Sequence, residues 1–332
     1  MDIQSIREGL LAMPEVRELP PMRALIGRAV RPSSIACWDY PGLACEALEG
    51  DAERTRPAAI AVFAMLCAIH LVDDMLDEDP EGLHHRLGPG IVANVASSFQ
   101  AAACRAIAQA ELAPTLACAI HARLATMTMA TALAQHRDTQ PCADEADYWR
   151  VIEGKTPPLF SCALAMGALI GGGTPEQVEG IAALGLEFGR MIQVSDDLKD
   201  ALEIPLAPDW RRPTNNLALL YASRAEHPER ERFVALLELL REPEPAPELL
   251  TEAQAIVWRS GAGSYCVYHL LAAHQRVEQA LRALELPDPG PLERLLRSPI
   301  QPVVELLRAA GVSEPERLVE WAVPTSESTT SP

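Results

Sequence analysis

The stretch AIHLVDDMLD (residues 68–77) passes from an apolar run directly into three carboxylates. An apolar run without Pro or Gly predicts a buried helix. On that helix Asp73 and Asp77 lie one turn apart on the same face, with Asp74 beside them. Three negative charges gathered at one end of an apolar helix need a cation, so we expect a cation-binding site at this point.

The same pattern returns in FGRMIQVSDDLKD (residues 188–200). If the two helices face each other, six carboxylates converge, and each raises the pKa of its neighbours unless divalent cations lie between them. Carboxylate ligands without His or Cys favour Mg²⁺ over zinc, and Mg²⁺ held in this way keeps positions open for phosphate oxygens. We therefore expect a diphosphate substrate. The predicted metal ligands are Asp73, Asp74, Asp77, Asp196, Asp197 and Asp200.

The composition predicts an all-α protein, because Ala and Leu are frequent and no segment alternates with a period of two. No uninterrupted apolar run reaches the ~18 to 20 residues of a membrane span, so we expect no transmembrane segment. The N-terminus lacks the pattern of a signal peptide, and the eight cysteines are scattered without a CxxC pair. These features favour a reducing, cytoplasmic location.

The charge pattern is acidic, with a net charge of −18 and no basic stripe, which argues against a nucleic-acid partner. Only two of the 28 basic residues are lysines, namely Lys155 in a Gly-Lys-Thr stretch and Lys199 inside the second acidic motif. Because Lys is a compact point charge and Arg a planar fork, a crowded diphosphate site favours the smaller cation. A proline pair directly after Thr156 predicts that Lys155 lies at a helix break and points into a cavity.

The two acidic motifs, with Gly154-Lys155-Thr156 between them and Gln193 before the second, resemble the trans-isoprenyl (polyprenyl) diphosphate synthase family of the class I terpenoid synthases. The resemblance covers roughly residues 20 to 285. It implies a single large helical bundle with a central apolar cavity. We expect this domain over residues 21–323, after a lead-in over 1–20 and before a disordered tail over 324–332.

The resemblance also implies roles for individual residues. Asp73, Lys155 and Asp197 are the predicted catalytic residues, and about three Mg²⁺ are expected to bind the substrate diphosphate with them. The sequence Ala134-Gln135-His136-Arg137-Asp138 is similar to the Gly-Gln-x-x-Asp that members of the family place over the allylic diphosphate. The predicted diphosphate-binding residues are Lys155, Gln193, Lys199, Gln135, Arg86, Arg28 and Arg31.

The acceptor half of the site departs from the family pattern. Where the family carries Gly-Gly-Lys-Arg-x-Arg-Pro, this chain keeps Arg28 and Arg31 but has Ala29 between them. The family's acceptor-binding His is Leu66 here, and its Arg-Arg-Gly loop is represented by His84, His85 and Arg86 in a segment (79–90) that its Pro and Gly residues predict to be a loop.

Two further segments correspond to the family only loosely. Arg211 and Arg212 fall where the family has a flexible loop with a Lys that closes over the diphosphates. Met65, Ala68 and Ile69 lie before the first motif, where large side chains stop a growing prenyl chain in the resembling enzymes. Because Ala68 is small, a hydrocarbon tail of fifteen carbons or more is expected to fit.

Three functions are compatible with these residues. The first is a Mg²⁺-dependent prenyltransferase that joins an allylic prenyl diphosphate to an acceptor such as isopentenyl diphosphate. The second is a class I terpene cyclase, in which a double bond of the substrate itself attacks the carbocation. The third is a non-catalytic subunit of a heteromeric synthase, although such subunits tend to lose acidic motifs. The resemblance also implies a homodimer.

Overall fold

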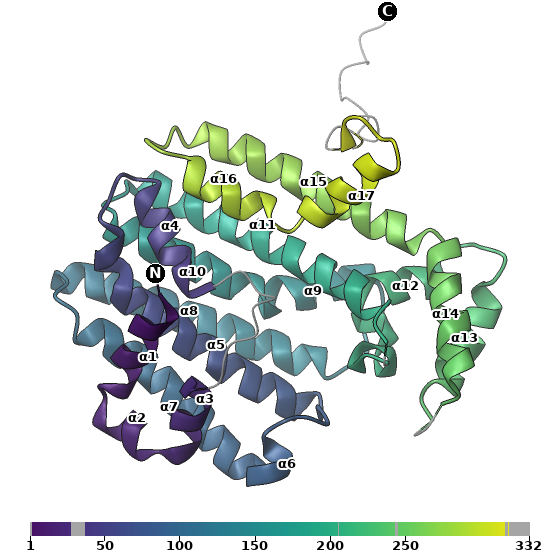
Figure 1. The fold of residues 1–332 in the computed structure, drawn as a ribbon, viewed down its shortest axis with the longest axis horizontal. Helices are drawn as coiled ribbons and strands as arrows, with labels where there is room; N and C mark the ends of the chain where they lie inside the picture. The colour runs from purple at the N-terminus through teal and green to yellow at the C-terminus, as the bar shows by residue number, and fades with distance from the viewer. Residues whose placement is uncertain (1, 28–36, 205, 243–244, 316–317, 319–332) are drawn as a thin grey trace, which may run out of the picture. The chain divides into compact units, whose positions relative to one another are not determined.

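The computed structural model describes residues 2–27, 37–204, 206–242, 245–315 and 318, and every regular element in these residues is helical (Figure 1). The predicted all-α class is confirmed. The first half contains α1 (Ile3–Leu11), α2 (Pro14–Glu18), α3 (Pro20–Gly27), η1 (Cys37–Asp39), α4 (Tyr40–Glu46), η2 (Ala52–Thr55), α5 (Arg56–Leu76), α6 (His84–Leu87), α7 (Pro89–Ala108), α8 (Pro114–Asp138), α9 (Glu145–Lys155) and α10 (Pro157–Ile170). The second half contains α11 (Pro175–Asp200), η3 (Pro208–Arg211), η4 (Pro213–Asn215), α12 (Leu217–Arg224), α13 (Arg230–Leu239), α14 (Pro247–Arg259), α15 (Ala262–Ala283), α16 (Gly290–Arg297) and α17 (Gln301–Ala309).

The chain groups into two compact units. The first comprises residues 1–190 and 280–293, and the second comprises 191–279 and 294–332. The boundary therefore falls inside α11, so that the second acidic motif belongs to the second unit and the first motif to the first. The domain limits expected from the sequence stay a prediction, and the expected tail over 324–332 lies outside the described residues.

The core of the first unit forms where α5 packs against α7 and where α4 packs against α10. Small residues allow the second contact, because a Cβ added at Gly167 would lie 2.0 Å from the Pro41 carbonyl oxygen. Tyr40, Phe160 and Phe188 form an aromatic cluster beside it, with ring centroids 5.2 to 5.7 Å apart. These contacts bury α4, α10 and the first part of α11 against one another.

Close glycine packing also fixes the break between α9 and α10. A Cβ at Gly189 of α11 would lie 2.4 Å from Pro157 Cα, and a Cβ at Gly185 would lie 2.6 Å from Ser161 Cα. The α11 backbone therefore approaches the first turn of α10 directly. Because Lys155 ends α9 immediately before that turn, this contact fixes the backbone that carries it.

Three helical segments are long and apolar enough to cross a membrane by length and composition, namely Ala52–Leu76, Pro89–Ala108 and Pro114–Asp138. The expected absence of a transmembrane segment stays a prediction, because a mean hydropathy tolerates the isolated charges that interrupt a strictly apolar run. The share of the most apolar window that is buried inside the protein is 50% for Ala52–Leu76, 44% for Pro89–Ala108 and 22% for Pro114–Asp138. The α8 helix thus keeps much of its apolar surface exposed.

The second unit contains α12, α13 and α14 packed together. Trp210 of η3 is fully buried and meets Phe233 of α13 edge to face, with ring centroids 6.3 Å apart. Two ion pairs, Arg232 with Glu252 and Arg259 with Glu229, connect the α13 region to α14. These contacts support the segment that follows the second acidic motif.

Candidate active site

The first acidic motif lies at the C-terminal end of α5. The helix ends at Leu76, and the backbone N–H of Asp77 donates to the Asp73 carbonyl oxygen at 2.8 Å, which keeps the two aspartates one turn apart. Carboxylate oxygens of Asp73, Asp77 and Asp138 all lie within 4.8 Å of one another. Asp138 comes from the last turn of α8, so two helices contribute to this group.

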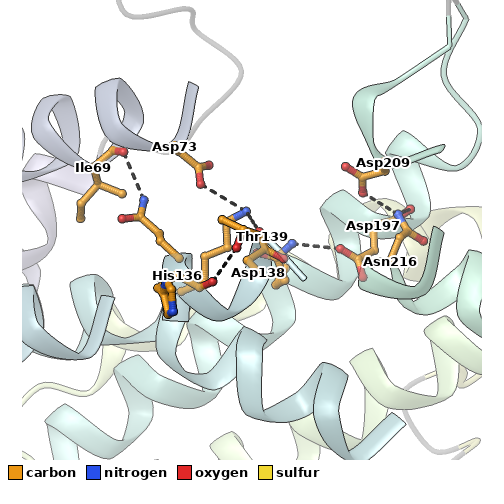
Figure 2. Close-up of polar contacts among 11 residues, drawn as sticks. Ile69, Asp73, His136, Asp138, Thr139, Asp197, Asp209 and Asn216 are labelled. Atoms are coloured by element: carbon orange, nitrogen blue, oxygen red, sulfur yellow. Dashed lines mark hydrogen bonds and ion pairs between the residues drawn. The ribbon is translucent and has the colours of Figure 1, made fainter. Parts of the chain in front are cut away.

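Lys155 contacts two of these carboxylates (Figure 2). Its Nζ lies 2.6 Å from Asp138 Oδ2 and 3.3 Å from Asp73 Oδ1. The side chain is 19% exposed. The α9 helix ends at Lys155 and α10 begins at Pro157, as the proline pair predicts. The helix break therefore points the lysine at the first acidic motif.

The pKa values at the first motif reflect crowding and burial. Burial raises the pKa of Asp73, with Lys155 opposing that rise. Burial, together with Asp79, Asp73 and Asp77, raises the pKa of Asp74 to about 6. Burial alone would lower the pKa of Lys155, but Asp73, Asp138 and Asp77 together raise it, so the ammonium stays charged. A divalent cation would remove the repulsion among these carboxylates.

His70 lies one turn before Asp73 on the same helix and was not among the predicted site residues. Its side chain is exposed, yet the surrounding protein lowers the pKa of the imidazole through burial, with Asp73 opposing. At neutral pH the imidazole is therefore uncharged beside the acidic motif.

Gln135 has a partner on α5. Its Nε2 donates to the Ile69 carbonyl oxygen at 3.3 Å, and the residue is 5% exposed. The amide thus ties α8 to α5 close to the first motif. Its predicted contact with a diphosphate stays a prediction.

The predicted pocket and acceptor residues are spread over several environments. Met65 and Ala68 are buried, whereas Ile69 is half-buried. Arg86 is exposed in the short helix α6, so this part of the predicted loop is helical. The His84 and His85 rings beside it lie with their centroids 4.1 Å apart and their planes tilted by 42°. Arg28 and Arg31 lie outside the described residues.

The second acidic motif ends α11. Asp196 is exposed at the surface of the helix end. Desolvation of its carboxylate by the surrounding protein raises its pKa, and the positive charge of Lys199 partly offsets that rise. Burial, Asp209 and Asp196 raise the pKa of Asp200 to about 7. Lys199 is exposed and lowers the pKa of both carboxylates. Asp196 and Asp200 therefore form a second place where a cation would be stabilised.

Asp197 differs from its neighbours because it is only 1% exposed. Its Oδ2 accepts from the backbone N–H of Leu217 at 2.7 Å, and its Oδ1 accepts from Gln193 Nε2 at 2.9 Å. Gln193 and Asp197 thus bind each other across one turn of α11. Their predicted roles toward substrate and metal stay predictions.

The donor set fits Mg²⁺, because both motifs present carboxylate oxygens, which are the hard ligands that Mg²⁺ prefers. Asp138 joins the first motif, although it was not among the predicted metal ligands and stands out in the sequence only through its similarity to the family's Gln-x-x-Asp pattern. Asp209 and Asn216 beside the second motif were missed. Their sequence, in the irregular segment 205–216, carries no motif that would have singled them out.

Comparison with known proteins places these features in a family. Residues 21–248 match the family model described as polyprenyl synthetase. The chain is 29% identical over 200 residues to nonaprenyl diphosphate synthase of Mycobacterium tuberculosis, covering 57% of this chain and 50% of that protein. It is 30% identical over 145 residues to a short chain isoprenyl diphosphate synthase of Methanothermobacter thermautotrophicus, covering 40% and 43%.

The fold has counterparts among solved structures. Geranylgeranyl pyrophosphate synthetase from Pyrococcus horikoshii superposes with a TM-score of 0.76 at 20% identity, covering 90% of this chain and 95% of that one. The sequence matches span about half the length of the curated relatives. Because the family model covers more than half of the chain, the chain belongs to the polyprenyl synthetase family.

Proposed function

We propose that the protein is a Mg²⁺-dependent prenyltransferase of isoprenoid biosynthesis. In this proposal it ionises an allylic prenyl diphosphate and joins the allylic group to an acceptor such as isopentenyl diphosphate. The observation that carries the proposal is the position of Lys155, whose ammonium lies between Asp73 and Asp138 at the acidic end of an apolar helix. Membership of the polyprenyl synthetase family supports the same chemistry.

Binding of the diphosphate is assigned to both motifs. Asp73, Asp74 and Asp77, with Asp138, would hold Mg²⁺ on one side, and Asp196 and Asp200 would hold it on the other. About three Mg²⁺ would supply charge stabilisation to the departing diphosphate. The proposal requires the two motifs to contact the same diphosphate.

Lys155 is assigned to the departing diphosphate as well. Its ammonium is held charged by its carboxylate partners, and it is already fixed in position before substrate binds. As the bond between C1 and the diphosphate oxygen breaks, negative charge grows on that oxygen, and a fixed N–H donor stabilises it. Lys199 and Gln193 are proposed to assist from α11.

The allylic carbocation then needs protection from water. The apolar residues of α5 before the first motif supply such surroundings, and the uncharged imidazole of His70 adds no positive charge there. A double bond of the acceptor attacks the cation and a proton is lost from the adduct. No protein nucleophile takes part in these steps.

The acceptor's own diphosphate is assigned to Arg86, together with Arg28 and Arg31. Arg86 is exposed and permanently charged, which suits a second anionic group. With fewer basic residues than the family pattern, this subsite is expected to bind isopentenyl diphosphate weakly.

A product assay tests the proposal. Purified protein is incubated with Mg²⁺ and geranyl, farnesyl or geranylgeranyl diphosphate, with and without isopentenyl diphosphate, and an EDTA-treated sample serves as the control. Longer prenyl diphosphates that form only with acceptor and Mg²⁺ support the proposal. A hydrocarbon or alcohol from the allylic substrate alone would identify a cyclase, and inertness in every mixture would favour a non-catalytic subunit.

We also propose that the protein is a homodimer through α7 and α8. Exposed small or apolar residues repeat at intervals of three and four along α8, and none is charged: Cys118, Ala122, Ala125, Met129 and Ala132. A similar uncharged series on α7 comprises Asn94, Ser97, Ala101, Cys104 and Ala108. The two helices pack against each other, and Met129 is 73% exposed. Water contact with this surface is unfavourable, and pairing with a second copy would bury it.

We propose a cytoplasmic location for the enzyme. None of the seven cysteines whose side chains the structure describes forms a disulfide, which suits a reducing compartment. Fractionation of cells that produce a tagged protein tests this, since recovery with the membrane pellet would contradict it.

A further inference from the structure

Asn216 connects three segments of the second unit (Figure 2). It is fully buried at the N-cap of α12, where its Oδ1 accepts from the N–H groups of Ala218 at 3.0 Å and Leu219 at 3.2 Å. Its Nδ2 donates to the Asp197 carbonyl oxygen at 2.8 Å and to Asp209 Oδ2 at 2.8 Å. The amide thus uses both hydrogens and both acceptor positions.

Asp197 is fixed from the other direction. Its two carboxylate oxygens accept from Leu217 and Gln193, and only 1% of the residue is exposed. Because this carboxylate is buried and both of its oxygens already accept hydrogen bonds, coordination of a metal would require the packing around it to open, which is costly. The geometry therefore gives Asp197 an anchoring role, joining the end of α11 to the start of α12.

Asp209 is held beside this anchor. Because one nitrogen donates to both acceptors at 2.8 Å, Asp209 Oδ2 lies no more than twice that distance from the Asp197 carbonyl oxygen. The neighbouring Trp210 is fully buried against Phe233, which fixes the other side of η3. The Asp197 carbonyl oxygen belongs to the last turn of α11, which also carries Asp200, so the Asp209 carboxylate lies beside the second acidic motif.

We propose that Asn216 is a positioning residue of the second acidic motif, which holds the carboxylate of Asp209 beside Asp196 and Asp200 as an additional negative charge for a divalent cation. Asp197 anchors the helix end in this arrangement and is not a ligand. The inference rests on the proposed function, because it assigns the second motif to cation binding. It adds a charge that lies outside the motif itself.

The side chain at position 216 has to be an amide for this role. Serine would keep the cap of α12 but could not reach Asp209 and Asp197 with two donors. Aspartate would keep the cap and place an acceptor oxygen against a second carboxylate. Only an amide caps the helix with one end and binds a carboxylate with the other.

Mn²⁺ binding to the full-length protein tests the inference without turnover. Bound Mn²⁺ is counted by electron paramagnetic resonance, and Asp200→Asn identifies the site that belongs to the second motif. We expect Asn216→Ser and Asp209→Asn each to weaken Mn²⁺ binding at that site by about tenfold, through loss of a nearby negative charge. The double variant is expected to bind no more weakly than Asp209→Asn alone, because both changes act through one carboxylate.

Leu236→Ala is the matched control, since it removes a buried side chain of α13 in the same unit without touching the bridge. It is expected to lower thermal stability and leave Mn²⁺ binding unchanged. The inference is overturned if Asp209→Asn or Asp200→Asn binds Mn²⁺ like the wild type. It is also overturned if Asn216→Ser weakens Mn²⁺ binding by the same factor in the Asp209→Asn variant as in the wild type. A wild type that binds Mn²⁺ but forms no product refutes the proposed function and leaves this inference standing.

Discussion

Lys155 combines a fixed position with a secure positive charge. Its two carboxylate partners come from α5 and α8, so the ammonium is oriented by helices rather than by a loop. A compact ammonium can donate to a diphosphate oxygen while remaining between two carboxylates, whereas a planar guanidinium needs a wider site. The residue therefore contributes both charge and geometry to the proposed ionisation.

Replacement of Lys155 tests that role. We expect Lys155→Met to lower kcat by at least about 100-fold, through loss of a fixed donor to the departing diphosphate. Lys155→Arg is expected to recover only part of the activity. Steady-state rates with an allylic substrate and isopentenyl diphosphate provide the measurement, and Glu81→Gln, an exposed change after the motif, is the control. A near-normal rate for Lys155→Met would remove this residue from the mechanism.

The second motif makes a prediction about pH. Because the pKa of Asp200 is raised to about 7 from its ordinary value of 3.8, the folded metal-free protein binds a proton there more tightly than the unfolded chain does. This carboxylate therefore opposes folding increasingly as the pH rises from about 4 to about 7.

The variant Asp200→Asn removes that penalty. Without metal, we expect its melting temperature to exceed that of the wild type by about 2 °C at pH 8 and to match it at pH 4 and below. Saturating Mg²⁺ should reverse the order at pH 8, because the wild type alone binds the ion fully. Thermal unfolding followed by circular dichroism measures this, and a difference independent of pH would contradict the assigned cause.

At the scale of elements, the crossing of α11 over the start of α10 sets the position of Lys155. Gly189 has no space for a side chain there, since its Cβ would meet the Pro157 backbone. We expect Gly189→Ala to lower the free energy of unfolding by about 1 to 3 kcal/mol. Because the helix break would shift, kcat should fall as well.

Gly90 near the start of α7 is the matched control for this substitution. A Cβ there meets nothing within 4 Å, so Gly90→Ala is expected to be neutral or to stabilise the helix by about 0.5 kcal/mol. Chemical denaturation of both variants provides the comparison. Equal effects at the two positions would show that the crossing does not constrain the break.

Helices bounded by proline were predictable from the sequence, whereas long-range polar contacts were not. The Pro157-Pro158 pair separates α9 from α10 as expected, because proline suits the first turn of a helix but not its interior. The ion pair between Lys155 and Asp138 and the bridge from Asn216 to Asp209 depend on how helices pack, which local patterns do not encode. Asp197 shows this limit of sequence-based prediction. The three aspartates of the second motif share one sequence pattern, yet only Asp197 is buried.

For the whole molecule, the exposed apolar face of α8 bears on assembly. Met129 is 73% exposed within an uncharged series of small residues. We expect Met129→Glu to convert a dimer into monomers, because a buried charge at the centre of the pairing surface is unfavourable. Light scattering after size exclusion measures the mass. Leu239→Glu, at another exposed apolar position, should leave the mass unchanged, and a wild type of monomer mass would refute the dimer.

The account depends on both acidic motifs holding one diphosphate through Mg²⁺. A crystal structure of the protein with Mg²⁺ and a thiolodiphosphate analogue, which cannot ionise, tests this most directly. We expect a diphosphate bound to Mg²⁺ ions, with Asp73 ligating on one side, Asp196 or Asp200 on the other, and Lys155 in contact with its oxygens. A diphosphate held by one motif alone, or bound away from both, would contradict the account.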